Sequence, residues 1–176
     1  GGQIAIRFPV EGEPRPPERW HVDGIPSPTN GVKAGTIGNY TMLAAIFLSD
    51  TPEAGMGNFS VLPGSHHIMA KHFRDHDPMS LVNGMPKISY PAPKAILARA
   101  GDLVLCHHLC CHTIWPNTSS KVRYAVFFRL HHVDRGEKAR MECYTDLWLE
   151  WPEIRTLSEA DGPTPAPSPK PQGAYD

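Results

Sequence analysis

Two His-x-Asp motifs are the residues whose types and spacing most clearly suggest chemistry. They are His21-Val22-Asp23 and His132-Val133-Asp134, in a chain that contains 10 histidines. Because residues i and i+2 of a strand point to the same face, an imidazole and a carboxylate at this spacing can bind one metal ion together. About one such pair is expected by chance among so many histidines, so the motif alone does not identify a site.

The two pairs differ in the number of histidines that lie after them in the chain. A facial triad of two histidines and one carboxylate needs a further histidine from elsewhere, and it leaves coordination positions open for a cosubstrate and oxygen. No histidine follows His132, whereas His21 precedes all the other histidines of the chain. We therefore interpret the second pair as the exposed end of a strand and the first as the candidate metal pair.

Three histidines are candidates for the third ligand: His107, His108 and His112. We favour His112, because we expect it to end the strand that begins at Gly101 and because it lies 11 residues before Arg123. That spacing allows a tight turn and a return strand, which would bring Arg123 close to His112. An arginine there can bind both oxygens of a dicarboxylate's end group. A buried ion pair between Arg123 and Asp102 is the alternative role for this arginine.

The elements that must position these residues are short and rich in turns. The chain has 19 prolines and 15 glycines in 176 residues, which disfavours long helices. Apolar patterns predict several strands, and a single weak helix is expected over residues 69–75. Short strands joined by turns are typical of a sandwich or barrel, so the fold class is all-β with few short helices. The predicted strands cover residues 2–10, 19–23, 40–48, 58–62, 95–106 (two strands divided by a glycine) and 122–133.

The chain divides into one domain and a tail. We expect a domain over residues 1–161 and a proline-rich C-terminal tail over residues 162–176, where the sequence reads GPTPAPSPKPQGAYD. Alternating prolines favour an extended polyproline-type conformation that cannot build a core. Residues 142–154 carry Trp148 and Trp151 and are expected to pack across the domain.

Composition excludes some function classes. The formal net charge is −1, so the chain lacks the basic surface that nucleic acid or an anionic membrane requires. No apolar run approaches the roughly 20 residues of a membrane span. The four cysteines are too few and too closely spaced for a disulfide scaffold. We interpret them as free thiols, which predicts a reducing, cytoplasmic location.

Three stretches, in order, give the chain a family resemblance. They are WHVDG at residues 20–24, GNFSVLPGSHH at residues 57–67, and GDLVLCHHLCCHTIWPNTSSKVR at residues 101–123. With these motifs the chain resembles the phytanoyl-CoA dioxygenase-like family of Fe(II)/2-oxoglutarate-dependent dioxygenases. The ordered conjunction is far more specific than any single motif.

The resemblance implies a fold, a site and a reaction. The fold would be a double-stranded β-helix, a jelly-roll or cupin-like barrel with the metal in its mouth. His21, Asp23 and His112 would be the iron ligands, and Arg123 would bind the distal carboxylate of 2-oxoglutarate. The enzyme would use Fe(II), 2-oxoglutarate and O2 to hydroxylate an unactivated C–H bond of a small molecule, with release of succinate and CO2.

One position departs from the family pattern, and the sequence does not define the substrate. The family often has Ser or Thr two residues after the distal histidine, but this chain has Ile114. The neighbouring Thr113 is then the hydroxyl on this segment that could contact the cosubstrate. The substrate class is not encoded clearly. An anionic small molecule would meet the basic side chains after the second motif, namely Lys71, His72, Arg74 and Lys87.

Three alternatives remain open from the residues. The domain could be a catalytically silent jelly-roll module that binds metal for regulation. It could be a cupin-like metalloenzyme that does not use 2-oxoglutarate, although such an enzyme has no need for Arg123. The third is a zinc site built from the cysteine cluster with a neighbouring histidine, that is Cys106, Cys110 and Cys111 with His107 or His108.

Overall fold

The computed structural model describes residues 1–27 and 30–160 and contains two antiparallel sheets and a few short helices. The predicted tail over residues 162–176 lies outside the described residues. The elements in chain order are β1 (Gly2–Arg7), β2 (Met42–Phe47), β3 (Phe59–Val61), α1 (Ser65–Asp75), the 3-10 helix η1 (Pro78–Asn83), β4 (Lys94–Ala95), β5 (Leu103–His107), β6 (His112–Ile114), β7 (Arg123–Leu130), α2 (Ala139–Glu142) and α3 (Pro152–Ala160).

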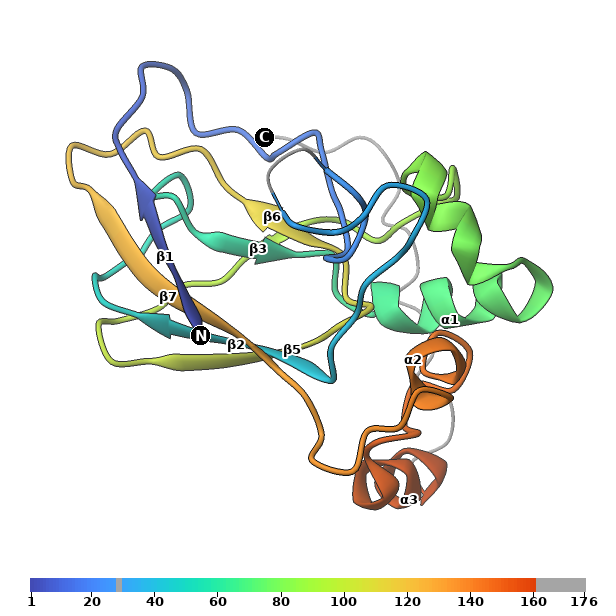
Figure 1. Ribbon diagram of the computed structural model, residues 1–176. Helices are drawn as coiled ribbons and strands as arrows, with labels where there is room; N and C mark the ends of the chain where they lie inside the picture. Colours follow the sequence, from blue (N-terminus) through green and yellow to red (C-terminus); the bar gives the residue numbers. More distant parts are fainter. Residues whose placement is uncertain (28–29, 161–176) are drawn as a thin grey trace.

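The two sheets face each other, as Figure 1 shows. The larger sheet has the strand order β1-β7-β2-β5 and the smaller one has the order β4-β3-β6. His21 extends the smaller sheet beyond β6 through an isolated bridge, in which His21 and His112 exchange two main-chain hydrogen bonds of 3.2 and 2.9 Å. Along the chain, segments of the two sheets alternate repeatedly, so neighbours within a sheet come from distant parts of the sequence.

Apolar side chains from both sheets fill the space between them. Phe59 of β3 contacts Phe127 of β7 with 5.5 Å between ring centroids, and Leu43 and Phe47 of β2 are buried beside them. Strand alternation explains this core, because odd-numbered residues of β2 and β7 point inward while their neighbours point outward. The prediction of a mainly β fold with few short helices is confirmed. A closed barrel is not, because the two sheets remain separate hydrogen-bonded units.

The structure corrects two predicted elements. Residues 19–23 do not form a strand, because only His21 makes bridge hydrogen bonds. His112 does not end the strand that follows Gly101. That strand, β5, ends at His107, where a turn closes with hydrogen bonds from the Cys110 amide to the His107 carbonyl (2.9 Å) and from the Leu109 amide to His107 Nδ1 (3.1 Å). His112 begins the next strand in the other sheet.

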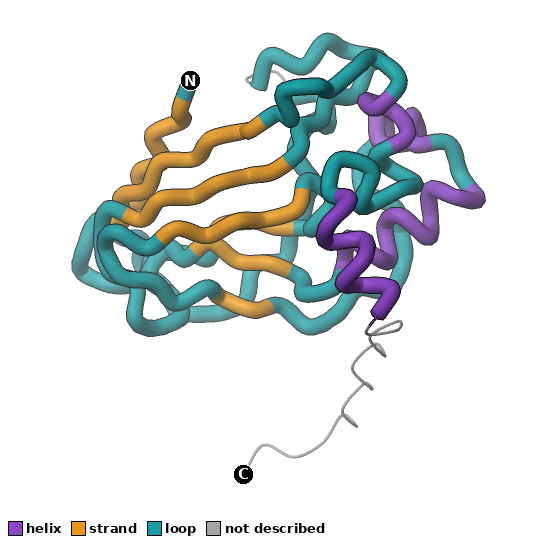
Figure 2. The backbone as a smooth tube through the Cα atoms, turned by 90° about the horizontal axis from the view of Figure 1, so that it is seen from below, coloured by secondary structure: helices purple, strands orange, loops and turns teal. Residues whose placement is uncertain are grey.

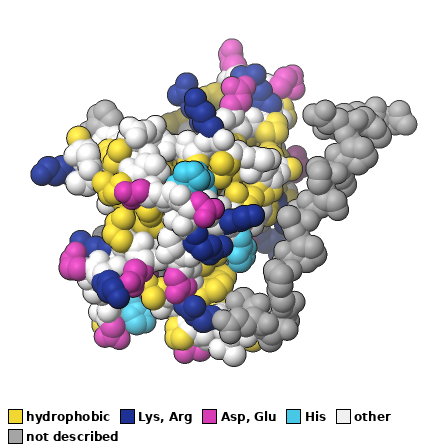
Figure 3. Space-filling model, turned by 90° about the vertical axis from the view of Figure 1, so that its right-hand side faces the viewer, with side chains coloured by type: hydrophobic (Ala, Val, Ile, Leu, Met, Phe, Trp, Pro, Cys, Tyr) yellow, Lys and Arg dark blue, Asp and Glu magenta, His cyan; other side chains and the backbone are white. Residues whose placement is uncertain are grey.

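The helices gather at one end of the sheets instead of covering a sheet face (Figures 1 and 2). α1 buries Met69 and Phe73 in a second apolar cluster that also contains Leu109 and Tyr144. The helix begins at Ser65, earlier than the predicted 69–75, and the buried Ser65 hydroxyl accepts a hydrogen bond from the Cys111 amide over 2.8 Å. In Figure 3, which views this end, acidic and basic side chains are interspersed. None of the helices in the described part of the chain has the length and apolar character that crossing a membrane would require.

Buried histidines connect α1 and β5 to the C-terminal segment. The His66, His107 and His108 rings form a chain of contacts with centroid distances of 5.5 and 4.4 Å, and Trp148 packs against His66 and His107. Burial lowers the pKa of His66 to about 3 and that of His107 to about 4, and it holds the pKa of His108 well below its usual value. The three rings are therefore neutral at physiological pH.

These histidines predict a loss of stability in mild acid. In the unfolded chain each ring takes up a proton near pH 6.5, whereas in the folded protein the pKa is about 3 for His66 and about 4 for His107, and burial keeps that of His108 well below its usual value. The stabilisation is thus present above pH 6.5 and is lost as the pH falls toward 4. We expect each ring to account for about 1–2 kcal/mol of the decrease in unfolding free energy between pH 7 and pH 5.

Urea unfolding at these two pH values measures the effect. His66→Phe should make the decrease smaller, whereas His132→Phe, at an exposed position, should leave it unchanged. An equal decrease in His66→Phe and in the unaltered protein would contradict this account.

Candidate metal centre

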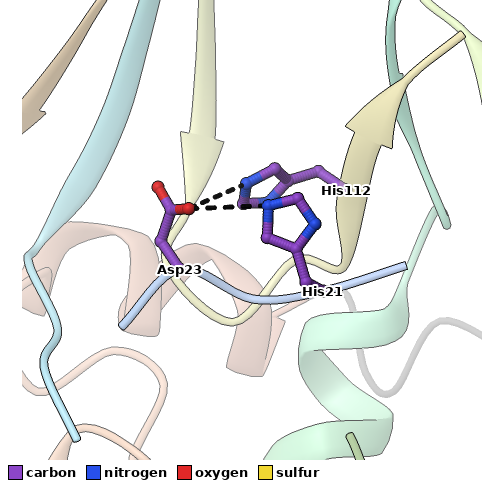
Figure 4. Close-up of side chains that lie close together, drawn as sticks. All are labelled: His21, Asp23 and His112. Carbon is purple, nitrogen blue, oxygen red and sulfur yellow. Dashed lines mark ion pairs between the residues drawn. The ribbon is translucent and has the colours of Figure 1, made fainter. Parts of the chain in front are cut away.

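Three side chains converge at the mouth of the two sheets (Figure 4). The Asp23 Oδ1 atom lies 3.6 Å from His21 Nε2 and 3.6 Å from His112 Nε2. One ligand atom from each of the three residues lies within 4.8 Å of the other two. Among the described residues this is the only group of three or more His, Cys, Asp or Glu side chains arranged so closely. Two imidazoles and one carboxylate are a donor set that suits a divalent transition metal.

Local alternation around Val22 directs His21 and Asp23 to one side. Val22 is 1% exposed and packs into the apolar cluster beneath α1, so its two neighbours point the opposite way. The chain then turns at Gly24, whose φ of +94° lies in the region that favours glycine. The Gly38 amide donates to the Gly24 carbonyl over 2.9 Å, and a Cβ on Gly24 would lie 1.6 Å from the Gly38 carbonyl oxygen. The His-x-Asp-Gly stretch therefore requires glycine at this position.

His112 is the first residue of β6, and its ring is held by the turn before this strand and by β3. Its Nδ1 lies 2.9 Å from the Cys110 carbonyl oxygen, which can only accept a hydrogen bond. Nδ1 therefore carries a proton, which leaves Nε2, the atom nearer Asp23, as the nitrogen that can bind a metal ion. The ring is buried and packs against Phe59 with 5.4 Å between centroids. The His21 side chain, by contrast, is 49% exposed, so the site is open to solvent on that side.

Two further residues hold Asp23, and neither was predicted from the sequence. Arg129 places Nε at 2.9 Å and Nη2 at 2.8 Å from Asp23 Oδ2, and the Tyr40 hydroxyl donates to the same oxygen over 3.1 Å. Burial raises the pKa of the Asp23 carboxyl, but close contact with His112 and His21 and the charge of Arg129 outweigh burial and hold that pKa well below its usual value. Arg129 lies an even number of residues after Arg123 on one strand, which was a usable signal that both face the site.

Arg123 lies next to the site but is covered by β1. It is 2% exposed, its Nε donates to the Gly57 carbonyl (2.7 Å), and its Nη1 donates to the Ala5 carbonyl (3.0 Å). Its Nη2 is buried without a hydrogen-bond partner. Arg7 stands directly opposite in the β1–β7 register, and burial together with the Arg7 charge lowers the pKa of Arg123 to about 10. No ion pair joins Arg123 to Asp102 or to any other carboxylate in the described residues.

Three cavities meet at Asp23: one of about 690 Å³ extends past Trp20 and His21, and the other two are also lined by Arg129. The inner cavity, of about 170 Å³, lies between the sheets and is lined by the triad together with Thr113, Ile114, Arg7 and Arg129, but not by Arg123. The side cavity, of about 590 Å³, lies beyond Asp23 and is lined by Tyr40, Asn39, Gln3 and His131 among others. Asp23 and Arg129 line both the inner and the side cavity and stand between them.

Other residues named from the sequence lie elsewhere. His132 and Asp134 are exposed after the end of β7, as their interpretation as a strand end predicts. The cysteines are buried free thiols, and none belongs to a metal-ligand cluster in the described residues. The basic side chains expected near the mouth line none of these cavities: Lys71, His72, Arg74 and Lys87. Arg74 instead donates to the Thr145 carbonyl, over 3.1 Å.

Comparison with known proteins gives similarity only among solved structures. No family model matches the chain, and no curated protein matches it. The non-heme alpha-ketoglutarate-dependent carbocyclase SnoK from nogalamycin biosynthesis is 26% identical, with a TM-score of 0.44 over 79% of this chain and 55% of that chain. The corresponding epimerase SnoN is 21% identical, with a TM-score of 0.48 over 72% of this chain and 45% of that chain.

A third similar structure holds a metal. HygX from Streptomyces hygroscopicus, with iron bound, is 17% identical, with a TM-score of 0.40 over 72% of this chain and 55% of that chain. HygX is also known with nickel, 2-oxoglutarate and hygromycin B bound. The chain spans about half the length of these solved structures. At such scores the similarity does not assign their reactions to this chain, and membership of the phytanoyl-CoA dioxygenase-like family stays a prediction.

The turn at Gly24 predicts a sharp effect of one added methyl group. We expect Gly24→Ala to lower the unfolding free energy by about 2 kcal/mol or more, because alanine disfavours this φ and its Cβ would collide with Gly38. Binding of Ni(II), measured by calorimetry, should weaken as Asp23 moves.

Gly35→Ala is the matched control. Gly35 also has a positive φ, +77°, but nothing lies within 4 Å of its added Cβ. Equal stability of the two variants would show that the approach of Gly38 to Gly24 does not constrain the site.

Proposed function

We propose that this chain carries the catalytic site of an Fe(II)/2-oxoglutarate-dependent dioxygenase that hydroxylates a small molecule. The observation that supports this most is the convergence of His21, Asp23 and His112 within 4.8 Å on a two-sheet β scaffold. Two histidines and one carboxylate leave several positions on an iron ion open. We further propose that the domain spans residues 1–161 and is a double-stranded β-helix of the phytanoyl-CoA dioxygenase-like type, with residues 162–176 as its tail.

The residues present fit an iron ion. His112 offers an Nε2 lone pair whose direction is fixed, and Asp23 is ionised at neutral pH. His21 approaches from the solvent side and completes the donor set. Bound iron, together with 2-oxoglutarate and O2, supplies the oxidation of a C–H bond with release of succinate and CO2.

The residues also fit a dicarboxylate. The buried Nη2 of Arg123 has no partner, which is costly for a guanidinium unless a ligand satisfies it. Arg7 lies opposite on β1 and lines the inner cavity, so two guanidinium groups lie close to one end of that cavity. We propose that they bind the distal carboxylate of 2-oxoglutarate, with Arg123 as the main partner, and that the Thr113 hydroxyl contacts the cosubstrate.

The apolar residues that line the inner cavity would position a bound cosubstrate and exclude water from it. Leu43, Phe59 and Phe127 give the inner cavity an apolar side, which limits the water that can reach a bound cosubstrate.

The side cavity beyond Asp23 is the proposed place for the substrate. Its size suits a small molecule. Among the described residues that line this cavity, the ion pair of Asp23 with Arg129 leaves no unpaired arginine or lysine, which favours a neutral polar substrate over an anionic one. Free buried cysteines agree with a reducing compartment such as the cytoplasm.

An anaerobic titration tests the proposed function. Addition of Fe(II) and then 2-oxoglutarate should produce a visible metal-to-ligand charge-transfer band. His112→Ala should abolish the band, and Arg123→Lys should weaken 2-oxoglutarate binding at least about tenfold, because lysine cannot reproduce the planar donor set of arginine.

His132→Ala is the control, because it removes a histidine from the other His-x-Asp pair and should leave the band intact. Absence of a band in unaltered protein that binds Fe(II) would contradict the proposal and would favour a silent metal-binding module or a metalloenzyme that does not use 2-oxoglutarate.

A further inference from the structure

The two oxygens of the Asp23 carboxylate have different surroundings. Oδ1 faces both histidines, at 3.6 Å from each Nε2, whereas Oδ2 points away from them (Figure 4). Oδ2 accepts hydrogen bonds from Arg129 Nε (2.9 Å) and the Tyr40 hydroxyl (3.1 Å), and Arg129 Nη2 lies 2.8 Å from it. A carboxylate oxygen offers about two lone-pair positions, so the hydrogen bonds from Arg129 Nε and the Tyr40 hydroxyl leave Oδ2 without free capacity.

Arg129 is itself held from two other sides. Its Nη1 donates to Gln3 Oε1 of β1 over 3.0 Å, and its guanidinium lies 5.9 Å from the centre of the Tyr40 ring. Tyr40 is 2% exposed and packs in the core between the sheets. The contact with Oδ2 is therefore supported by β1 and by the core between the sheets.

The way in which a carboxylate binds an ion decides how many positions remain for other ligands. A carboxylate can give an ion one oxygen or both, and the second oxygen occupies a position that is then lost to a cosubstrate or oxygen. We infer that Arg129, supported by Tyr40, is a positioning residue that keeps Oδ2 engaged and so restricts Asp23 to one metal–oxygen bond. This inference rests on the proposed function, because it assigns Arg129 a role toward the ion that the triad would bind.

Mn(II) is a suitable probe because water-proton relaxation reports how many water molecules the bound ion holds. With three protein donor atoms, about three waters are expected on the ion in the unaltered protein. In Arg129→Met both oxygens of Asp23 become available, and about one water fewer is expected at saturating Mn(II). Affinity for Mn(II) should stay the same or rise, because a donor is gained and a nearby positive charge is removed. A purely structural role of Arg129 would instead weaken Mn(II) binding and leave the number of waters unchanged.

Controls separate the possible results. Arg99→Met removes an arginine that lines none of the three cavities and should behave like the unaltered protein. Because the Arg129 side chain is 42% exposed, we expect Arg129→Met to fold. A thermal melt checks this, and Arg129→Leu repeats the test with a second side chain that cannot donate a hydrogen bond to Oδ2. An unchanged number of waters in a folded Arg129 variant would overturn the inference. If the unaltered protein instead binds no Mn(II) that depends on His112, the proposed metal site itself fails.

Discussion

Two main-chain hydrogen bonds between His21 and His112 hold the candidate centre together. They join a loop near the start of the chain to the first residue of β6, and within the described ranges 1–27 and 30–160 no regular strand pairing supports His21 on its other side. Because the bonds are made by the backbone, they place both imidazoles next to each other, with 4.7 Å between ring centroids, whatever the side chains around them. The turn at Gly24 and the buried Val22 then decide where Asp23 lies relative to this pair.

The carboxylate of Asp23 is a largely buried negative charge, and the residues around it must compensate for the loss of water. It is 13% exposed, and burial of a charge is unfavourable unless partners compensate for it. Arg129 supplies an opposite charge and Tyr40 a neutral donor, both directed at one oxygen. The same contacts divide the inner cavity from the side cavity, since Asp23 and Arg129 form part of both walls. The contact between Asp23 and Arg129 thus both compensates the buried charge and separates the two cavities.

Local patterns in the sequence were sufficient for the strands and for part of the site. Alternation identified β1, apolar runs and the turn residues that follow them identified β2, β3 and β7, and the His-x-Asp spacing with a late histidine identified three side chains that the fold brings together. Contacts between residues that are distant in the sequence could not be predicted from these local patterns. Tyr40 precedes a strand that looks uniformly apolar, and nothing in its neighbourhood indicates a carboxylate partner. The covering of Arg123 by β1 depends on the pairing register, and the end of β5 at His107 depends on a turn that carries neither glycine nor proline.

The orientation of His112 has a consequence for how this site tolerates sequence change. Its Nδ1 proton is received by the main-chain carbonyl of residue 110, and every amino acid supplies such a carbonyl. Replacement of Cys110 would therefore leave the imidazole aimed as before, provided that the turn keeps its shape. Asp23, in contrast, depends on the side chains of Arg129 and Tyr40, either of which a single codon change can remove. The aim of the His112 ring thus does not depend on which side chain stands at its hydrogen-bonding partner, whereas the carboxylate half is tied to the identity of two distant residues.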